Sequence, residues 1–101
     1  MAFNKLTGKP LNNAIVWCDQ RTADIVKDVV AKVGGVDVFR PVCGLPINTY
    51  FSALKMKWLL ANSQAVKDEA KKEDSALCFG TIDTWLISVS KIIISDSIGR
   101  D

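Results

Sequence analysis

The segment AIVWCDQRTADIVKDVVAKVGG, residues 14–35, carries the clearest fold signal in the chain. Its first five residues form a short apolar run, β-branched at its centre, which is typical of a buried strand covered on both faces. Thr22 can cap a helix, since apolar residues then recur at three- and four-residue spacing until Gly34 and Gly35 end the pattern. These apolar positions are Ala23, Ile25, Val26, Val29, Val30 and Val33. A strand followed at once by an amphipathic helix is half of a βαβ unit, so the sequence predicts an α/β fold.

A second helix is predicted at about residues 49–62, after a loop that contains Gly44 and Pro46. Its apolar face is formed by Phe51, Leu54, Trp58 and Leu59. Tyr50 falls in the first turn, where a side chain can face a cleft instead of the core. Ser63 predicts the cap of a further helix over residues 64–72.

Shorter patterns predict a helical turn at residues 36–40, an apolar stretch at 76–79 and a strand at 92–94. A further helix is predicted to start at Thr81 or Asp83 and to run through Ile87. Together these elements predict a helix-rich chain with one clear strand, residues 14–18. No internal repeat or second domain is visible.

Composition excludes several classes of function. The chain has 101 residues, 49% of them apolar, and a formal charge of +2, which predicts neither nucleic-acid nor membrane attraction. Its three cysteines, Cys18, Cys43 and Cys78, are widely spaced and odd in number, which argues against a disulfide framework or a zinc site. Histidine, the commonest general base and metal ligand, is absent from the sequence. With no signal peptide and no membrane span in the sequence, we expect a cytoplasmic chain.

Few side chains are candidates for chemistry. Asp19 follows the expected strand, where catalytic carboxylates often lie, but a lone Asp there is more often a helix cap or an ion-pair partner of Arg21. Cys18 has no histidine to activate it, so a buried, inert thiol is expected. Gly34 and Gly35 close a helix and open none, which favours a helix end over a phosphate-binding loop.

Two aromatic residues, Trp17 and Tyr50, are candidates for substrate binding. An indole face can cover the carbon edge of a small polyol while a phenol hydroxyl bonds one of its oxygens. On pattern alone, placement of both residues in the core is the more frequent outcome. Trp58 and Trp85 lie on apolar helix faces, and we expect them in the core.

Three stretches, residues 13–22, 44–60 and 79–87, resemble successive blocks of glycerol kinases in the FGGY carbohydrate kinase family, in the same order and spacing. They include Asn13 to Trp17, Gly44-Leu45-Pro46 followed by Tyr50, and Phe79-Gly80-Thr81 running to Ile87. The resemblance implies part of an actin-like (ribonuclease H-like) ATPase domain. It also implies transfer of the γ-phosphoryl group of ATP, with magnesium, to glycerol, with Tyr50 and Trp17 contacting glycerol.

Several parts of the family pattern have no counterpart in this sequence. These are an Arg-Glu pair that binds glycerol, a phosphate-binding loop, the catalytic aspartate and the ATP-binding C-terminal domain. We therefore expect residues 5–87 to form a partial N-terminal domain on the glycerol-binding side, and residues 88–101 a divergent tail. The chain alone is expected to be inactive, with no catalytic, cofactor-binding or metal-binding residue, and with weak or absent polyol binding.

Two alternatives stay open at this point. One is a non-catalytic truncated isoform that associates with a full-length kinase as an interaction module. Its motivation is the apolar surface expected where sheet strands are missing. The other is an incomplete gene product with no independent role.

Overall fold

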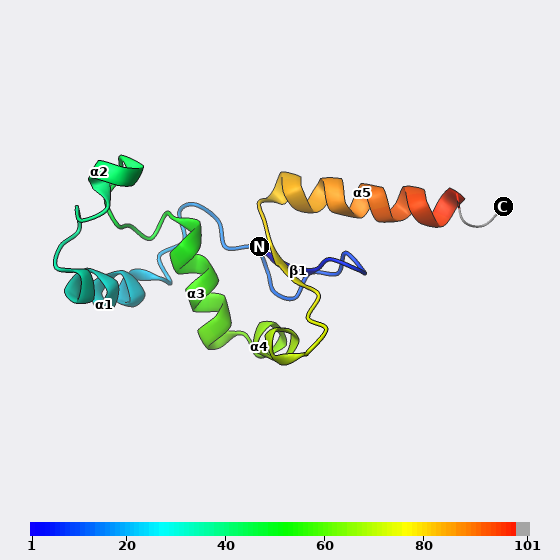
Figure 1. Ribbon diagram of the computed structural model, residues 1–101, viewed down its shortest axis with the longest axis horizontal. Coiled ribbons are helices and arrows are strands. Elements are labelled where there is room, and N and C mark those ends of the chain that lie inside the picture. The colour runs from blue at the N-terminus through cyan, green and yellow to red at the C-terminus, as the bar shows by residue number, and fades with distance from the viewer. Residues whose placement is uncertain (99–101) are drawn as a thin grey trace. The chain divides into compact units, whose positions relative to one another are not determined.

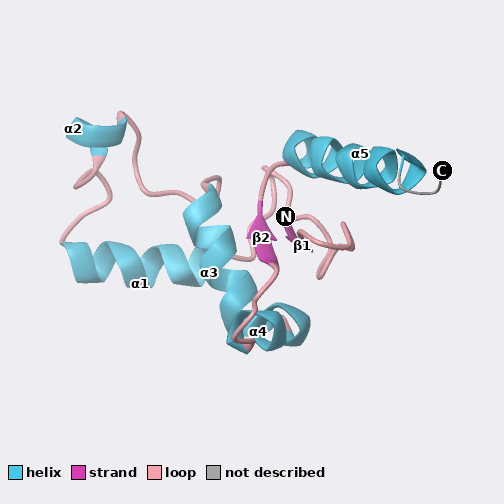
Figure 2. Cartoon of the chain, turned by 45° about the vertical axis from the view of Figure 1, so that its right-hand side comes forward, coloured by secondary structure: helices cyan, strands magenta, loops and turns pink. Residues whose placement is uncertain are grey.

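The computed structural model describes residues 1–98, which form helices and two short strands (Figures 1 and 2). In chain order they are β1 (Ala2–Asn4), α1 (Ala23–Val33), α2 (Arg40–Cys43), α3 (Ser52–Asn62), α4 (Gln64–Lys71), β2 (Leu77–Phe79) and α5 (Ile82–Ile98). The chain divides into two compact units. Unit 1 comprises residues 1–14 and, in the described part, 59–98; unit 2 comprises residues 15–58, so the boundary falls within α3.

Unit 1 contains the sheet, in which β1 and β2 pair antiparallel with Phe3 opposite Cys78. The two strands lie side by side (Figure 2). Backbone bonds extend the pairing, since the Met1 amino group donates to the Gly80 carbonyl at 2.6 Å and the Gly80 N–H donates to the Met1 carbonyl at 3.0 Å. The buried apolar residues of this unit are Ala2, Phe3, Leu59, Val66 and Ala76. Unit 1 therefore has a small apolar core beside its sheet.

Helix α4 is tied to the segment that enters β2. Ser63 caps the helix by accepting a bond from the Val66 N–H at 3.5 Å, which confirms the predicted cap. The buried Glu69 carboxylate accepts a bond from the Ala76 N–H at 3.0 Å and from the Lys72 ammonium at 2.7 Å. These two bonds satisfy a charge that would otherwise be costly to bury.

A tight turn before Pro10 anchors α5. Gly8 has a φ of +74°, and its N–H donates to the Asn4 carbonyl at 2.8 Å. The half-buried Trp85, which was expected in the core, donates its indole N–H to the Gly8 carbonyl at 2.8 Å. A Cβ at position 8 would lie only 3.0 Å from a methyl carbon of Val89, so both conformation and space favour glycine here.

Unit 2 begins with the loop that precedes α1. The helix ends at Gly34, whose φ is +92° and whose N–H donates to the Val30 carbonyl at 3.0 Å. This confirms the predicted amphipathic helix and its glycine end. Its apolar stripe is half-buried, while Lys27, Asp28 and Lys32 are exposed, and no residue of α1 is fully buried.

The prediction of a strand at residues 14–18 is wrong. This segment is a loop and turn in which Val16, Trp17 and Cys18 are exposed, so the expectation of a buried Cys18 thiol is wrong as well. A strand needs a neighbouring backbone to pair with, and the two strands within residues 1–98 pair with each other. The one clear strand is thus replaced by a two-stranded antiparallel sheet elsewhere, in a chain that is helix-rich as expected.

Helix positions differ from the prediction in three places. The strand expected at residues 92–94 is part of α5, because helical hydrogen bonds are local and need no partner strand. Helix α2 begins at Arg40, with Pro41 in its first turn where a missing N–H has no cost. Helix α3 begins at Ser52, later than expected. The rest of the predicted tail, residues 99–101, lies outside the described part of the chain. Among the described helices, none has the length and apolar character needed to cross a membrane.

Candidate functional site

Trp17 and Tyr50 each occupy the centre of a tight turn in unit 2. The Asp19 N–H donates to the Val16 carbonyl at 3.2 Å, which places Trp17 inside the first turn. The Phe51 N–H donates to the Asn48 carbonyl at 3.3 Å, which places Tyr50 inside the second. Both side chains are largely accessible, since Trp17 is 72% and Tyr50 55% exposed. Pattern alone favoured a core position for both residues, but neither lies in the core.

The loops that carry these aromatics meet through two threonines. The Thr22 hydroxyl donates to the Thr49 carbonyl at 3.4 Å. The Thr49 hydroxyl lies 3.0 Å from Asn48 Oδ1 and 3.5 Å from Gln20 Oε1. Both threonines are buried. The predicted capping role of Thr22 is wrong in detail, since Thr22 precedes α1 but its side chain makes no cap bond. The connection between residues 20–22 and 48–50 joins distant segments, and no local sequence pattern signals it.

The rings of the two aromatics have different surroundings. Tyr50 meets Phe51 edge to face at 5.4 Å, and the Lys55 ammonium lies 5.8 Å from the centre of the Tyr50 ring. No ring contact joins Tyr50 to Trp17 in the described part of the chain. The structure therefore brings together the loops that carry Trp17 and Tyr50, but not the two rings.

Asp19 forms an ion pair with Arg21, which confirms the structural alternative considered for this carboxylate. The Arg21 Nε lies 2.9 and 3.0 Å from the two Asp19 oxygens, and Nη2 lies 2.8 Å from one of them. Hydrogen bonding to the Arg21 side chain, and then to its backbone N–H, lowers the pKa of Asp19. A carboxylate held ionised in this way accepts a proton poorly, so Asp19 is a weak general base.

Arg21 also extends the site toward α3. Its guanidinium carbon lies 4.8 Å from the centre of the Trp58 ring, within the range of a cation–π contact. Trp58, which was expected in the core, is half-buried. The Asp19–Arg21–Trp58 row thus connects the loop after Trp17 with the helix that follows Tyr50.

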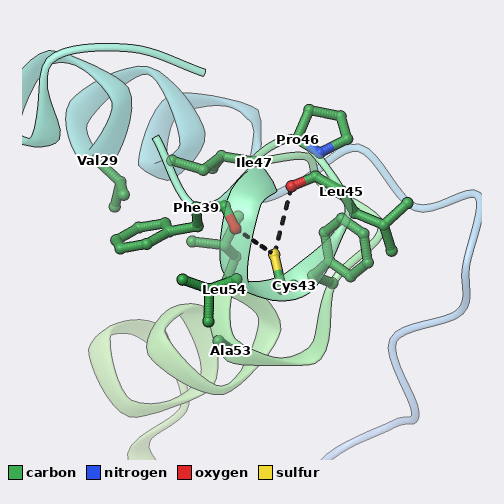
Figure 3. Close-up of a pocket in the computed structure, with 10 residues that line it drawn as sticks. Val29, Phe39, Cys43, Leu45, Pro46, Ile47, Ala53 and Leu54 are labelled. Atoms are coloured by element: carbon green, nitrogen blue, oxygen red, sulfur yellow. Dashed lines mark hydrogen bonds between the residues drawn. The ribbon is translucent and has the colours of Figure 1, made fainter. Parts of the chain in front are cut away.

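An apolar pocket of about 460 Å³ is also present in unit 2 (Figure 3). Its lining residues are Val29, Phe39, Val42, Cys43, Leu45, Pro46, Ile47, Phe51, Ala53 and Leu54. The Cys43 thiol points to backbone oxygens within the wall, 3.1 Å from the Phe39 carbonyl and 3.4 Å from the Leu45 carbonyl (Figure 3). Because the lining offers almost no polar side chain, this pocket suits apolar groups and not a polyol. The sequence did not predict it, because its walls come from three helices and a loop.

The described residues contain no cluster of metal ligands, since within residues 1–98 no three Cys, Asp or Glu side chains lie close enough to hold a metal ion. Gly34 ends α1, as predicted.

Comparison with known proteins gives a consistent result. Residues 1–90 match the N-terminal domain of the FGGY family of carbohydrate kinases. The chain is 51% identical over 88 residues to a glycerol kinase of Arabidopsis thaliana, a match that covers 86% of this chain and 16% of the relative. It is 48% identical over 89 residues to a probable glycerol kinase of Caenorhabditis elegans and 49% identical over 87 residues to a glycerol kinase of Roseiflexus sp.. These two matches each cover 86% of this chain and 17% of the relative, so the chain spans about one sixth of the relatives' length.

Proposed function

This chain belongs to the FGGY family of carbohydrate kinases, and on that premise we propose that it forms one wall of a glycerol site in a cytoplasmic glycerol kinase. Tyr50 supplies a hydroxyl to a glycerol oxygen, and Trp17 covers the carbon chain with its indole face. In the complete enzyme, glycerol accepts the γ-phosphoryl group of ATP with the help of magnesium.

The observation that carries this proposal is the threonine link between the two loops. Thr22 and Thr49 hold residues 20–22 against residues 48–50, while Trp17 and Tyr50 stay exposed. An exposed indole and an exposed phenol on adjoining loops suit a ligand with both carbon and hydroxyl surface. The names of the similar proteins, glycerol kinases from a plant and a bacterium, support glycerol as that ligand.

No step of phosphoryl transfer is assigned to residues of this chain. The described residues do not fit a metal site, and Asp19 is committed to Arg21. We therefore expect the purified 101-residue chain to form no glycerol 3-phosphate when it is mixed with ATP, magnesium and glycerol. Its contribution is to bind and orient glycerol for groups elsewhere in the enzyme.

The proposal is tested in a graft, in which residues 1–90 replace the similar segment of the Arabidopsis thaliana glycerol kinase. Tyr50→Phe removes one hydrogen bond, so the KM for glycerol is expected to rise about two- to twelvefold with kcat nearly unchanged. Phe39→Leu, a change in the apolar pocket, is the matched control and leaves the KM within about twofold. An unchanged KM in the Tyr50→Phe graft would contradict the proposal.

A second candidate function is a non-catalytic module that associates with a full-length FGGY kinase. The observation that favours it is the apolar pocket, whose lining residue Val42 is 90% exposed. Size-exclusion chromatography of the chain, alone and with the Arabidopsis thaliana kinase, distinguishes the two functions. A stable complex that Val42→Asp abolishes supports the module, and a monomer that ignores the kinase counts against it.

A further inference from the structure

We propose that Thr22 is a positioning residue for Tyr50, an inference that rests on the proposed function. The buried Thr22 hydroxyl donates to the carbonyl of Thr49, the residue directly before Tyr50. It thereby fixes the direction in which the Tyr50 phenol leaves the turn.

The turn that carries Tyr50 is weakly held by its own bonds. Its one backbone hydrogen bond, from the Phe51 N–H to the Asn48 carbonyl, measures 3.3 Å. Tyr50 is more than half exposed, and within the described residues its aromatic and cation–π contacts are with near neighbours in sequence, Phe51 and Lys55. A turn of this kind takes its orientation from contacts with other segments.

Thr22 provides such a contact from a rigid support. Its carbonyl accepts a bond from the Val26 N–H at 2.9 Å, so its backbone belongs to the first turn of α1. Its side chain is β-branched, which restricts rotation about χ1. The residue is 0% exposed, so no bulk water replaces the Thr49 carbonyl as its partner. The bond length of 3.4 Å is long for a hydroxyl donor, but a buried pair still loses free energy when one partner is removed.

Thr49 also approaches a second residue of the loop before α1. The Thr49 hydroxyl lies within 3.5 Å of Gln20 Oε1, and the Gln20 carbonyl accepts a bond from the Ala23 N–H at 3.1 Å. The Thr49 hydroxyl proton has a nearer acceptor in Asn48 Oδ1, at 3.0 Å, so Gln20 only adjoins the Tyr50 turn, whereas Thr22 donates a bond to it. Residues 20 and 22 both follow the turn that contains Trp17. Thr22 therefore connects the segment that follows Trp17 with the turn that contains Tyr50.

A purely local role for the Thr22 hydroxyl does not fit the geometry. A threonine before a helix normally caps the helix with its side chain, but Thr22 makes no cap bond. Ser63, in the equivalent place before α4, does make one. The Thr22 hydroxyl is thus directed to the Tyr50 turn and not to its own helix.

The test compares three variants of the 101-residue chain by two-dimensional NMR. Thr22→Val keeps the shape and removes the hydroxyl, Thr22→Ser keeps the hydroxyl, and Thr84→Val makes the same change at an exposed threonine of α5. In Thr22→Val we expect the Thr49 and Tyr50 amide signals to move toward unfolded-chain positions while those of α1 stay. Thr22→Ser restores them, and Thr84→Val leaves them unchanged.

The same changes in the Arabidopsis thaliana graft give the functional measurement. Because the bond is long, Thr22→Val is expected to raise the KM for glycerol about two- to fivefold with kcat nearly unchanged, and Thr22→Ser to restore it. Equal effects of Val and Ser, in either measurement, would overturn the positioning role, as would no effect of Val. If Tyr50→Phe raises the KM but Thr22→Val does not, only this inference fails. If Tyr50→Phe has no effect, the proposed function itself fails.

Discussion

In unit 1 the fully buried large side chains are apolar, Phe3 and Val66, whereas in unit 2 the fully buried residue is a threonine, Thr22. Unit 1 also contains the sheet, the capped helix α4 and the glycine turn that anchors α5. Unit 2 relies on two ion pairs, two threonine bonds and half-buried helix faces, and Leu54 is its one buried apolar residue in the described chain.

The difference shows how each unit is stabilised and which side chains remain exposed. Apolar burial stabilises a unit but hides its side chains, while polar links between loops hold turns in place and here leave Trp17 and Tyr50 exposed. Trp17 and Tyr50 lie in the unit that is held by polar links. The candidate site therefore occupies the less buried part of the molecule, which is usual for ligand-binding loops on a firmer scaffold.

The largest effect is expected from emptying the core of unit 1. Phe3 is 1% exposed, so Phe3→Ala should lower the free energy of unfolding by about 3–5 kcal/mol. Leu6→Ala, at a residue that is 70% exposed, should change it by less than about 0.5 kcal/mol. Urea unfolding followed by tryptophan fluorescence measures both variants. A Phe3→Ala variant as stable as Leu6→Ala would contradict the claim that apolar burial stabilises unit 1.

A smaller loss of stability is expected when alanine replaces a glycine of positive φ, and comparing one such glycine from each unit distinguishes backbone strain from crowding. Gly8 and Gly44 both have positive φ, so alanine costs about 1–2 kcal/mol at either position. At Gly8 the new methyl also meets Val89 at 3.0 Å, which adds about 1 kcal/mol or more, whereas nothing lies within 4 Å at Gly44. Urea unfolding should therefore rank Gly8→Ala below Gly44→Ala in stability. The reverse order would show that α5 does not pack against this turn.

Acid should weaken unit 1 through Glu69. The bonds to Lys72 and to the Ala76 N–H lower the pKa of Glu69 in the folded state. The stabilisation is fully present above the ordinary glutamate pKa of about 4.3 and is lost as the pH falls through the lower folded-state value. Glu69→Gln should flatten this part of the stability–pH curve, measured by urea unfolding at a series of pH values. Glu73→Gln, at an exposed residue, is the matched control.

The smallest effect concerns the Asp19–Arg21 ion pair of unit 2. Arg21→Lys keeps the charge but loses the fork that binds both Asp19 oxygens, so the pKa of Asp19 should rise toward its ordinary value. Stability should change little, because the pair is at the surface. Carbon-13 NMR titration of the Asp19 carboxyl measures the shift, and Arg40→Lys is the control at the other ion-paired arginine of unit 2. An unchanged Asp19 titration in Arg21→Lys would contradict the role given to this fork.

Features set by local sequence could be predicted, and features set by distant contacts could not. The end of α1 at Gly34 and the cap of α4 at Ser63 depend on a few neighbouring residues, and both predictions are confirmed. The pairing of β1 with β2 joins distant parts of the chain, which no local pattern indicates. The strand predicted at residues 14–18 is wrong because an apolar run forms a strand only where its surroundings offer a pairing partner. The connection between the loops that carry Trp17 and Tyr50 likewise could not be predicted, because it depends on bonds between distant segments. The binding roles of these two residues stay predictions.

The most direct test of the central claim is a crystal structure of the Arabidopsis thaliana graft with glycerol bound. We expect the Tyr50 hydroxyl within hydrogen-bond distance, about 2.5–3.0 Å, of a glycerol oxygen, with the Trp17 indole face against the glycerol carbons. Bound glycerol with neither residue in contact would contradict the proposed site.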